Sequence, residues 1–232
     1  MYSRIINGEE HFFGVSGKLI RNVLVMYDRE TNTLWSQLLG EAVDGELQGT
    51  KLEFLPSVMT TWDQWREMHP DTVAIKKGYF GNRDPYLNYY YSDDAGVIGS
   101  TNFDDRLGTK EFVIGVEVEN EAVAYPFSVL DSQPVVNDEI GGLPVVVAFD
   151  QETGAGAVWE RNLPDGQILE FVQHEEFYMR DNETGSLWNG LTGQAIDGAL
   201  AGTTLERVQS TQSFWFGWVD FHEDTILYGI DS

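Results

Sequence analysis

The sequence predicts a mainly β fold: a duplicated, pseudo-symmetric β-rich unit, barrel- or sandwich-like, with one short helix in each repeat. The first observation is that Asp28–Val73 aligns without a gap onto Asp181–Ile226, with 21 identical residues in 46 positions. Similarity of this extent at a constant offset indicates two copies of one structural unit. The second observation is a series of short apolar segments separated by turn residues about every 8 to 12 positions, which is typical of all-β proteins.

The positions of the two copies divide the chain into three segments. Residues 1–75 hold the first repeat unit, and residues 111–232 hold the second. On this alignment the first unit is incomplete and the chain opens in mid-unit, because nothing equivalent to Phe112–Phe149 precedes the first copy. Residues 76–110 connect the units and are rich in Gly, Asp, Asn and Tyr, so we expect an ordered excursion.

Recurring glycines predict the corners between strands. Gly40, Gly45 and Gly49 suit bulges or sharp reversals, and the second copy has the same spacing at Gly193, Gly198 and Gly202. Gly141-Gly142 separates two apolar segments and predicts a two-residue hairpin.

Each copy also predicts one short helix that carries two tryptophans. Thr61 can cap a helix that begins at Trp62, and Pro70 ends it. The two tryptophans of such a helix lie on one face. We expect the repeated tryptophans to be mainly core: Trp35, Trp62 and Trp65, and their counterparts Trp188, Trp215 and Trp218.

Composition excludes several classes of function. The formal charge is −24, from 38 acidic and 14 basic residues, and such a field repels nucleic acids and anionic membranes. A salt-adapted surface, calcium binding or an acidic surface without special meaning can each explain it, and low salt should weaken the fold. The mean hydropathy of −0.28 and the lack of long apolar runs predict no membrane span. The absence of cysteine excludes thiol nucleophiles, disulfides and thiolate metal sites.

Several motifs resemble the domain-of-unknown-function family 3179. They include Phe13-Gly-Val-Ser-Gly17, Val25-Met-Tyr-Asp-Arg29, His69-Pro-Asp-Thr72, Arg83-Asp-Pro-Tyr86 and Phe214-Trp-Phe-Gly-Trp218, and the match covers nearly the whole chain. The resemblance implies a β-rich duplicated domain, often exported, with no established activity. Similar proteins commonly carry a Cys-Pro-Leu-Cys-like motif where this chain has Asp150-Gln-Glu-Thr153, so any chemistry of those cysteines is absent here.

Two histidines recur in the repeat, and each is followed by an acid two residues later: His69 with Asp71, and His222 with Asp224. A histidine beside a carboxylate can act as a general base or a metal ligand. The structural alternative is a histidine that interacts with the last carbonyls of a helix.

Paired acids offer candidate metal ligands. Asp28 and Glu30, with their counterparts Asp181 and Glu183, lie on alternate positions at the end of a predicted strand and could hold calcium. A turn in which Asp and Thr side chains bond to the backbone is the structural alternative. Further acidic pairs that could gather calcium are Asp93-Asp94 and Asp104-Asp105.

The connecting segment offers a candidate stacking surface for sugars or other planar ligands. Aromatic rings with a polar end suit such contacts, although core packing or burial in an interface is the safer account of them. The candidate ligand-binding residues are Arg83, Tyr86, Tyr89, Tyr90 and Tyr91.

From these observations we expect a binding or assembly module outside the cytoplasm, with a small-molecule or glycan ligand or a second copy of the chain as partner. The alternative is a hydrolase-like enzyme that depends on a metal ion or on histidine and carboxylates, with its site between the two repeats.

Overall fold

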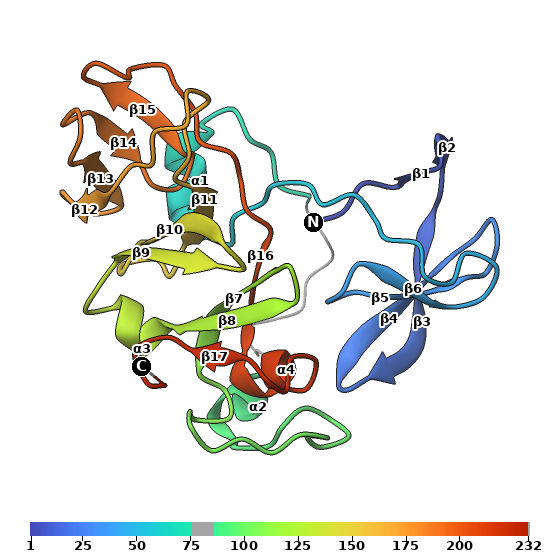
Figure 1. The fold of residues 1–232 in the computed structure, drawn as a ribbon. Coiled ribbons are helices and arrows are strands. Elements are labelled where there is room, and N and C mark those ends of the chain that lie inside the picture. Colours follow the sequence, from blue (N-terminus) through green and yellow to red (C-terminus); the bar gives the residue numbers. More distant parts are fainter. Residues whose placement is uncertain (76–85, 232) are drawn as a thin grey trace.

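The computed structural model describes residues 1–75 and 86–231, and it is mainly β, as predicted (Figure 1). Its strands form small sheets of two to four strands. The barrel-like alternative is wrong for the described residues, because every sheet ends on two edge strands that pair with no further strand. Closing a barrel requires continuous pairing around the whole sheet, and many of these strands span only two to four residues.

The first repeat folds as a four-stranded antiparallel meander in the order β3-β4-β5-β6, which we call the first meander. Its strands are β3 (Phe13–Ile20), β4 (Val23–Asp28), β5 (Leu34–Ser36) and β6 (Glu41–Asp44), and the hairpin β1 (Ile5–Ile6) and β2 (Glu9–Glu10) precedes them. Arg21 and Asn22 both have positive φ, as the tight hairpin between β3 and β4 requires. Trp35 is fully buried at the centre of a small core.

The second repeat contains a meander of the same order, β12-β13-β14-β15, which we call the second meander. Its strands are β12 (Phe171–Gln173), β13 (Tyr178–Asp181), β14 (Leu187–Asn189) and β15 (Gln194–Asp197). Both meanders have a register shift at the corresponding residues, Leu34/Trp35 and Leu187/Trp188. Trp188 is fully buried, like Trp35, but its core is larger because strand β10 packs against it.

Two further sheets carry most of the remaining core. The three-stranded sheet β11-β10-β9 holds the hairpin predicted at Gly141-Gly142, where Leu143 pairs with Ile140. The other sheet has the order β16-β7-β8-β17, with β17 parallel to β8. The strands are β7 (Phe112–Val118), β8 (Glu121–Pro126), β9 (Val135–Ile140), β10 (Leu143–Phe149), β11 (Gly156–Glu160), β16 (Ser210–Phe214) and β17 (Ile226–Leu227). In Figure 1 these sheets and the second meander follow one another on one side, and the first meander lies on the other.

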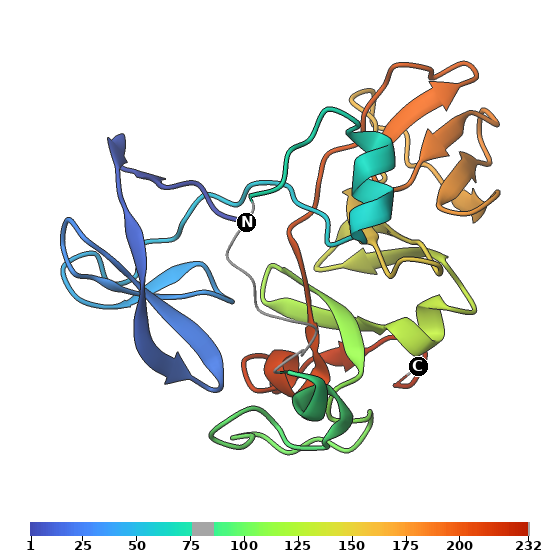
Figure 2. The same ribbon diagram turned by 180° about the vertical axis from the view of Figure 1, so that it is seen from behind.

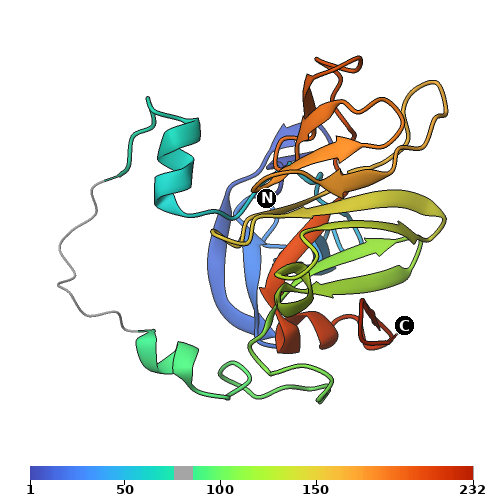
Figure 3. The ribbon, with the colours of Figure 1, turned by 90° about the vertical axis from the view of Figure 1, so that its left-hand side faces the viewer.

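Four short helices occur in the described residues: α1 (Trp62–Met68), α2 (Leu87–Tyr91), α3 (Phe127–Leu130) and α4 (Trp215–Val219). Thr61 caps α1 as predicted, since its side chain accepts a hydrogen bond from the backbone N–H of Gln64 at 3.3 Å. Seen from the side, α1 and α2 extend away from the strands (Figure 3). No described helix is long and apolar enough to cross a membrane.

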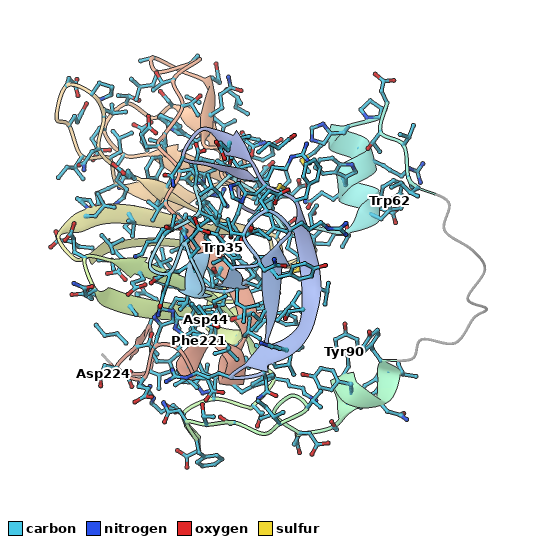
Figure 4. The ribbon with its side chains drawn as sticks, turned by 90° about the vertical axis from the view of Figure 1, so that its right-hand side faces the viewer. Trp35, Asp44, Trp62, Tyr90, Phe221 and Asp224 are labelled. Atoms are coloured by element: carbon cyan, nitrogen blue, oxygen red, sulfur yellow. The ribbon has the colours of Figure 1, made fainter. Side chains whose placement is uncertain are left out.

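The prediction that all the repeated tryptophans are core is wrong for α1. Trp62 is 51% exposed and Trp65 is 39% exposed, whereas Trp215 and Trp218 of α4 are buried. In Figure 4, Trp62 lies at the outer side of α1, away from the strands. The physical reason is that β16, which leads into α4, pairs with β7, while residues 55–61, which lead into α1, belong to no strand. The first helix therefore has no sheet beneath it.

Side chains from both repeats hold the described part of the connecting segment in place. The Asn22 side chain accepts hydrogen bonds from the backbone N–H groups of Val97 and Ile98 at 2.9 and 2.8 Å. The buried Asp220 carboxylate accepts bonds from the N–H groups of Thr101 and Asn102 at 2.9 and 2.6 Å. Through residues 97–102, these bonds link the hairpin of β3 and β4 to the end of α4.

Candidate functional site

The first of the predicted acids, Asp28, closes the turn after β4. Its carboxylate is fully buried and accepts bonds from the Thr31 N–H at 2.6 Å and from the Trp35 indole N–H at 2.9 Å. Burial by itself would raise the pKa of Asp28, but these hydrogen bonds outweigh it and hold the pKa below its usual range. The second repeat has the same bonds, with the same effect on the pKa: Asp181 accepts from Thr184 N at 2.5 Å and from Trp188 Nε1 at 2.8 Å.

The second acid of each pair also bonds to the backbone. Glu30 accepts from the Phe12 N–H at 2.9 Å, and Glu183 accepts from the Glu170 N–H at 3.0 Å. Both acid pairs therefore support the same turn, which is the structural role that the sequence left open.

The first repeat adds a histidine to this turn that sequence reasoning missed. Ligand atoms of His11, Asp28 and Glu30 lie within 4.8 Å of one another. His11 lies before the gap-free part of the repeat, so no counterpart marked it. A longer alignment of the two repeats would have paired His11 with Leu169. The structure supports this pairing, because the His11 N–H donates to Arg4 O and the Leu169 N–H donates to Arg161 O.

The repeated histidines close their helices in the same way. The His69 ring lies 4.1 Å from the Trp65 ring, and the His222 ring lies 3.9 Å from the Trp218 ring. The backbone N–H of each histidine donates to the carbonyl of that tryptophan. The two rings differ in their surroundings, because α1 is exposed and α4 is buried.

The acids that follow the histidines do not join them. Asp71 and Asp224 are exposed, and within the described residues no hydrogen bond or ion pair connects either one to its histidine. Burial lowers the pKa of His222, and the charge of Glu117 opposes this only in part. The carboxylate that acts on His222 is therefore Glu117 of β7, which local spacing could not indicate.

The predicted stacking surface lies on and beside α2. Tyr86, Tyr90 and Tyr91 are exposed, whereas Tyr89 is half-buried, with the Lys110 ammonium 3.8 Å from the centre of its ring. Arg83 lies outside the described residues. The tyrosines line neither of the two large cavities described below.

Within the described part of the chain, the remaining acidic pairs belong to no cluster of three side chains that could ligate a metal ion. Asp93 and Asp94 are exposed and join no group of three metal-ligating side chains. Asp104 instead forms an ion pair with Arg106 at 2.7 Å, and the hydrogen bonds of that guanidinium lower the pKa of the Asp104 carboxyl.

Two cavities lie between the first meander and the second repeat. Cavity 1 has a volume of about 460 Å³, and its lining includes Lys51 from the first repeat and Glu117, Trp218 and His222 from the second. It is therefore the place where His222 can meet a ligand. His69 lines neither this cavity nor the next one.

Cavity 2 has a volume of about 340 Å³ and shares Leu38 and Thr211 with cavity 1, so the two form one groove. Among the residues that the structure describes, its lining contains no acidic residue, although the chain carries 38 of them. Arg207 is the one charged side chain in this described lining, and it lies 4.6 Å from the centre of the Trp159 ring and donates from Nη2 to Ser57 O at 3.2 Å. Burial lowers the pKa of Arg207 to about 10, so it remains positively charged at neutral pH.

Matched positions of the two repeats both contribute to the lining of cavity 2. At the offset of the alignment, Phe54 corresponds to Arg207, Met59 to Gln212, and Ser57 to Ser210. At two of these three positions the first repeat supplies an apolar side chain and the second a polar one, whereas the third position has serine in both repeats. The Oε1 atom of Gln212 is buried without a hydrogen-bond partner, so the polar wall has unused capacity.

Comparison with known proteins gives the family. No curated protein and no solved structure matches the chain. One family model, described as a protein of unknown function, DUF3179, matches residues 1–225. The motifs described above extend through the same range, and the chain therefore belongs to the DUF3179 family.

Proposed function

We propose that this protein is a binding module whose ligand lies in the groove between the two repeats. The groove has the size of a small-molecule site, since each cavity falls within the range of about 300–1,000 Å³ that such sites occupy. Two contacts between the repeats hold its walls: Arg21, in the turn between β3 and β4, donates to the Asp220 carbonyl, and Arg207 donates to the carbonyl of Ser57, which lies beyond β6.

The observation that carries the proposal is Arg207. In a chain with a net charge of −24, this guanidinium has no ion-pair partner among the described residues. A buried or half-buried charge is costly unless it is paired. An anionic group on a ligand would supply the missing partner, and a guanidinium binds carboxylates through two parallel hydrogen bonds.

The opposite wall indicates what the rest of the ligand is. Phe54, Met59 and Met26 offer apolar surface in the same cavity as Arg207. A molecule with an anionic head and an apolar body would contact both walls. We therefore propose an organic anion, with a carboxylate as the simplest head group, as the class of ligand.

A homologous series of carboxylates tests this proposal. Acetate, butyrate, hexanoate and octanoate are titrated into the full chain by calorimetry at constant ionic strength. We expect affinity to rise about fourfold for each added methylene that enters the cavity, because burying one contributes about 0.8 kcal/mol. Arg207→Gln should weaken octanoate binding at least tenfold.

Two controls separate this site from general effects of charge and hydrophobicity. Arg66→Gln removes the same charge from an exposed position on α1 and should leave binding unchanged. Octanol lacks the anionic head and should bind more weakly than octanoate. The absence of saturable binding for the whole series, or equal losses in the Arg66 and Arg207 variants, would refute the proposal.

A second candidate function is a hydrolase-like activity in cavity 1. What favours it is the His222 ring, whose lowered pKa leaves it neutral at pH 7 and whose side chain forms no hydrogen bond among the described residues. A neutral imidazole in a cavity can accept a proton from a bound water or hydroxyl group. In that case Glu117, rather than Asp224, is the carboxylate that assists His222.

The location is part of the same proposal. We place the module outside the cytoplasm, as the family resemblance implies, where its acidic surface would hold water and cations. Assembly with a second copy, or stacking of a glycan on Tyr90 and Tyr91, would use the surface around α1 and α2, two helices that extend away from the strands in Figure 3.

A further inference from the structure

His11 is a buried side chain whose ring nitrogen has no hydrogen-bond partner. The residue is 5% exposed, and its Nδ1 atom is buried without a donor or acceptor within reach. The carboxylate oxygens beside it are Asp28 Oδ1 at 3.5 Å and Glu30 Oε2 at 3.8 Å. Hydrogen bonds between nitrogen and oxygen are about 2.7–3.2 Å long, so neither contact satisfies the imidazole.

The same separations fit two ligands of one metal ion. With metal–ligand distances of about 2.0–2.2 Å, neighbouring ligand atoms in a tetrahedral site lie about 3.4 Å apart. The three ligand atoms lie within 4.8 Å of one another. Three groups donate to the Asp28 carboxylate, namely the Thr31 N–H, the Thr31 hydroxyl and the Trp35 indole, and the Phe12 N–H donates to Glu30. A carboxylate has about four lone-pair sites, so each of the two retains at least one for a metal ion.

The second repeat shows that the turn does not need the imidazole. Asp181 and Glu183 make the same bonds to Thr184, Trp188 and Glu170 as their counterparts make in the first repeat. There Leu169 takes the position of His11 and is fully buried. A buried histidine whose Nδ1 atom has two carboxylates nearby but no hydrogen bond of normal length, in a place where leucine supports the same turn, points to a shared ligand.

We propose that His11 Nδ1, Asp28 and Glu30 bind one divalent transition-metal ion of the zinc class. One imidazole and two carboxylates suit such ions, whereas calcium prefers oxygen ligands alone. The Glu30 side chain is 36% exposed, so the ion can enter from that side and solvent can complete its coordination. The site lies outside the groove and does not depend on the function proposed for it.

The test uses zinc and the full chain, stripped of metal with a chelator and desalted. Calorimetric titration with zinc chloride at pH 7 should give one ion per chain, and cobalt should give the visible absorption of a low-coordinate site. Binding should weaken as the pH falls, because a proton competes for the imidazole. Without saturable zinc binding, the proposal fails.

His11→Leu copies the second repeat and should weaken zinc binding more than about 100-fold, since even outer-shell changes cost about 10–100-fold. Its melting temperature without metal should stay near that of the wild type, because leucine already supports the equivalent turn. His174→Leu, at an exposed histidine beside two glutamates, is the matched control and should leave the stoichiometry unchanged.

Leu169→His provides the reciprocal test, since it places an imidazole beside Asp181 and Glu183 and should raise the stoichiometry to two. Equal zinc affinity in the wild type and His11→Leu would overturn the proposal. So would calcium binding without zinc binding, or a wild type in which His11 only adds a pH-dependent part of stability through an ion pair with Asp28.

Discussion

Trp65 and Trp218 occupy the same place in two copies of one sequence motif, yet Trp65 is 39% exposed and Trp218 is 3% exposed. Their local bonds are the same. Trp65 donates from its indole to Thr72 at 3.0 Å, and Trp218 donates to Thr225 at 2.9 Å. The motif therefore specifies the helix and its closing turn by itself, whereas burial depends on a partner element elsewhere in the chain.

The partner of α4 is strand β7, and one residue shows how closely the two fit. A side chain at Gly115 would come within 2.3 Å of the Trp218 ring, so only glycine allows that ring to lie on the strand. For α1, which is seen from behind in Figure 2, the partner is a turn instead. Gln64 donates to Asp150 at 2.6 Å, and Thr153 donates to Gln64 at 3.1 Å. A sheet buries one helix, and polar bonds hold the other.

The largest effect should come from truncating the matched tryptophans. Trp215→Ala should lower the free energy of unfolding by about 3–5 kcal/mol, because the ring is fully buried. Trp62→Ala should cost less than about 1 kcal/mol, because half of that residue is already exposed. Urea unfolding of both variants measures the difference. Equal losses would mean that a further partner covers α1 in solution.

A middle-sized and equal effect should come from the acids that close the two turns. Asp28→Asn and Asp181→Asn should each cost about 1.5–3 kcal/mol, because each buried carboxylate accepts several hydrogen bonds. Both pKa values are lowered in the folded state, so this stability is fully present above the unfolded pKa of about 3.9 and is lost as the pH falls through the folded value.

Acid unfolding curves of the two variants check this expectation. Each substitution should flatten the wild-type loss of stability below about pH 4, and by the same amount in either repeat. If only Asp28→Asn changed the curve, the two turns would not be equivalent, and the His11 side chain would be the first place to look for the cause.

The smallest effect on stability is expected at the histidines, where the comparison concerns activity. His69→Gln and His222→Gln should each change the free energy of unfolding by less than about 1 kcal/mol. If the hydrolase-like alternative holds, His222→Gln abolishes turnover of a p-nitrophenyl ester and His69→Gln does not, because only His222 lines cavity 1. The wild-type rate should fall as the pH drops through the lowered pKa of His222. Turnover that survives in both variants would exclude His222 as the base.

Local features were the predictable part of this molecule. The gap-free repeat gave the two turns at Asp28 and Asp181, and the hairpin at Gly141-Gly142 followed from turn chemistry. What the sequence could not give depends on contacts between distant segments. Trp62 is exposed for lack of a sheet, Arg207 and Phe54 line the same cavity, and His11 meets Asp28 only after β3 and β4 pair.

Unlike residues occupy matched positions in the lining of cavity 2, and this affects how substitutions can alter such a groove. In a homodimer, a groove on the symmetry axis has identical walls, and every substitution appears twice. Here the matched positions belong to one chain, so Phe54 and Arg207 could diverge independently. A duplicated chain can therefore distinguish the two ends of a ligand, whereas a symmetric pair of subunits must treat them alike.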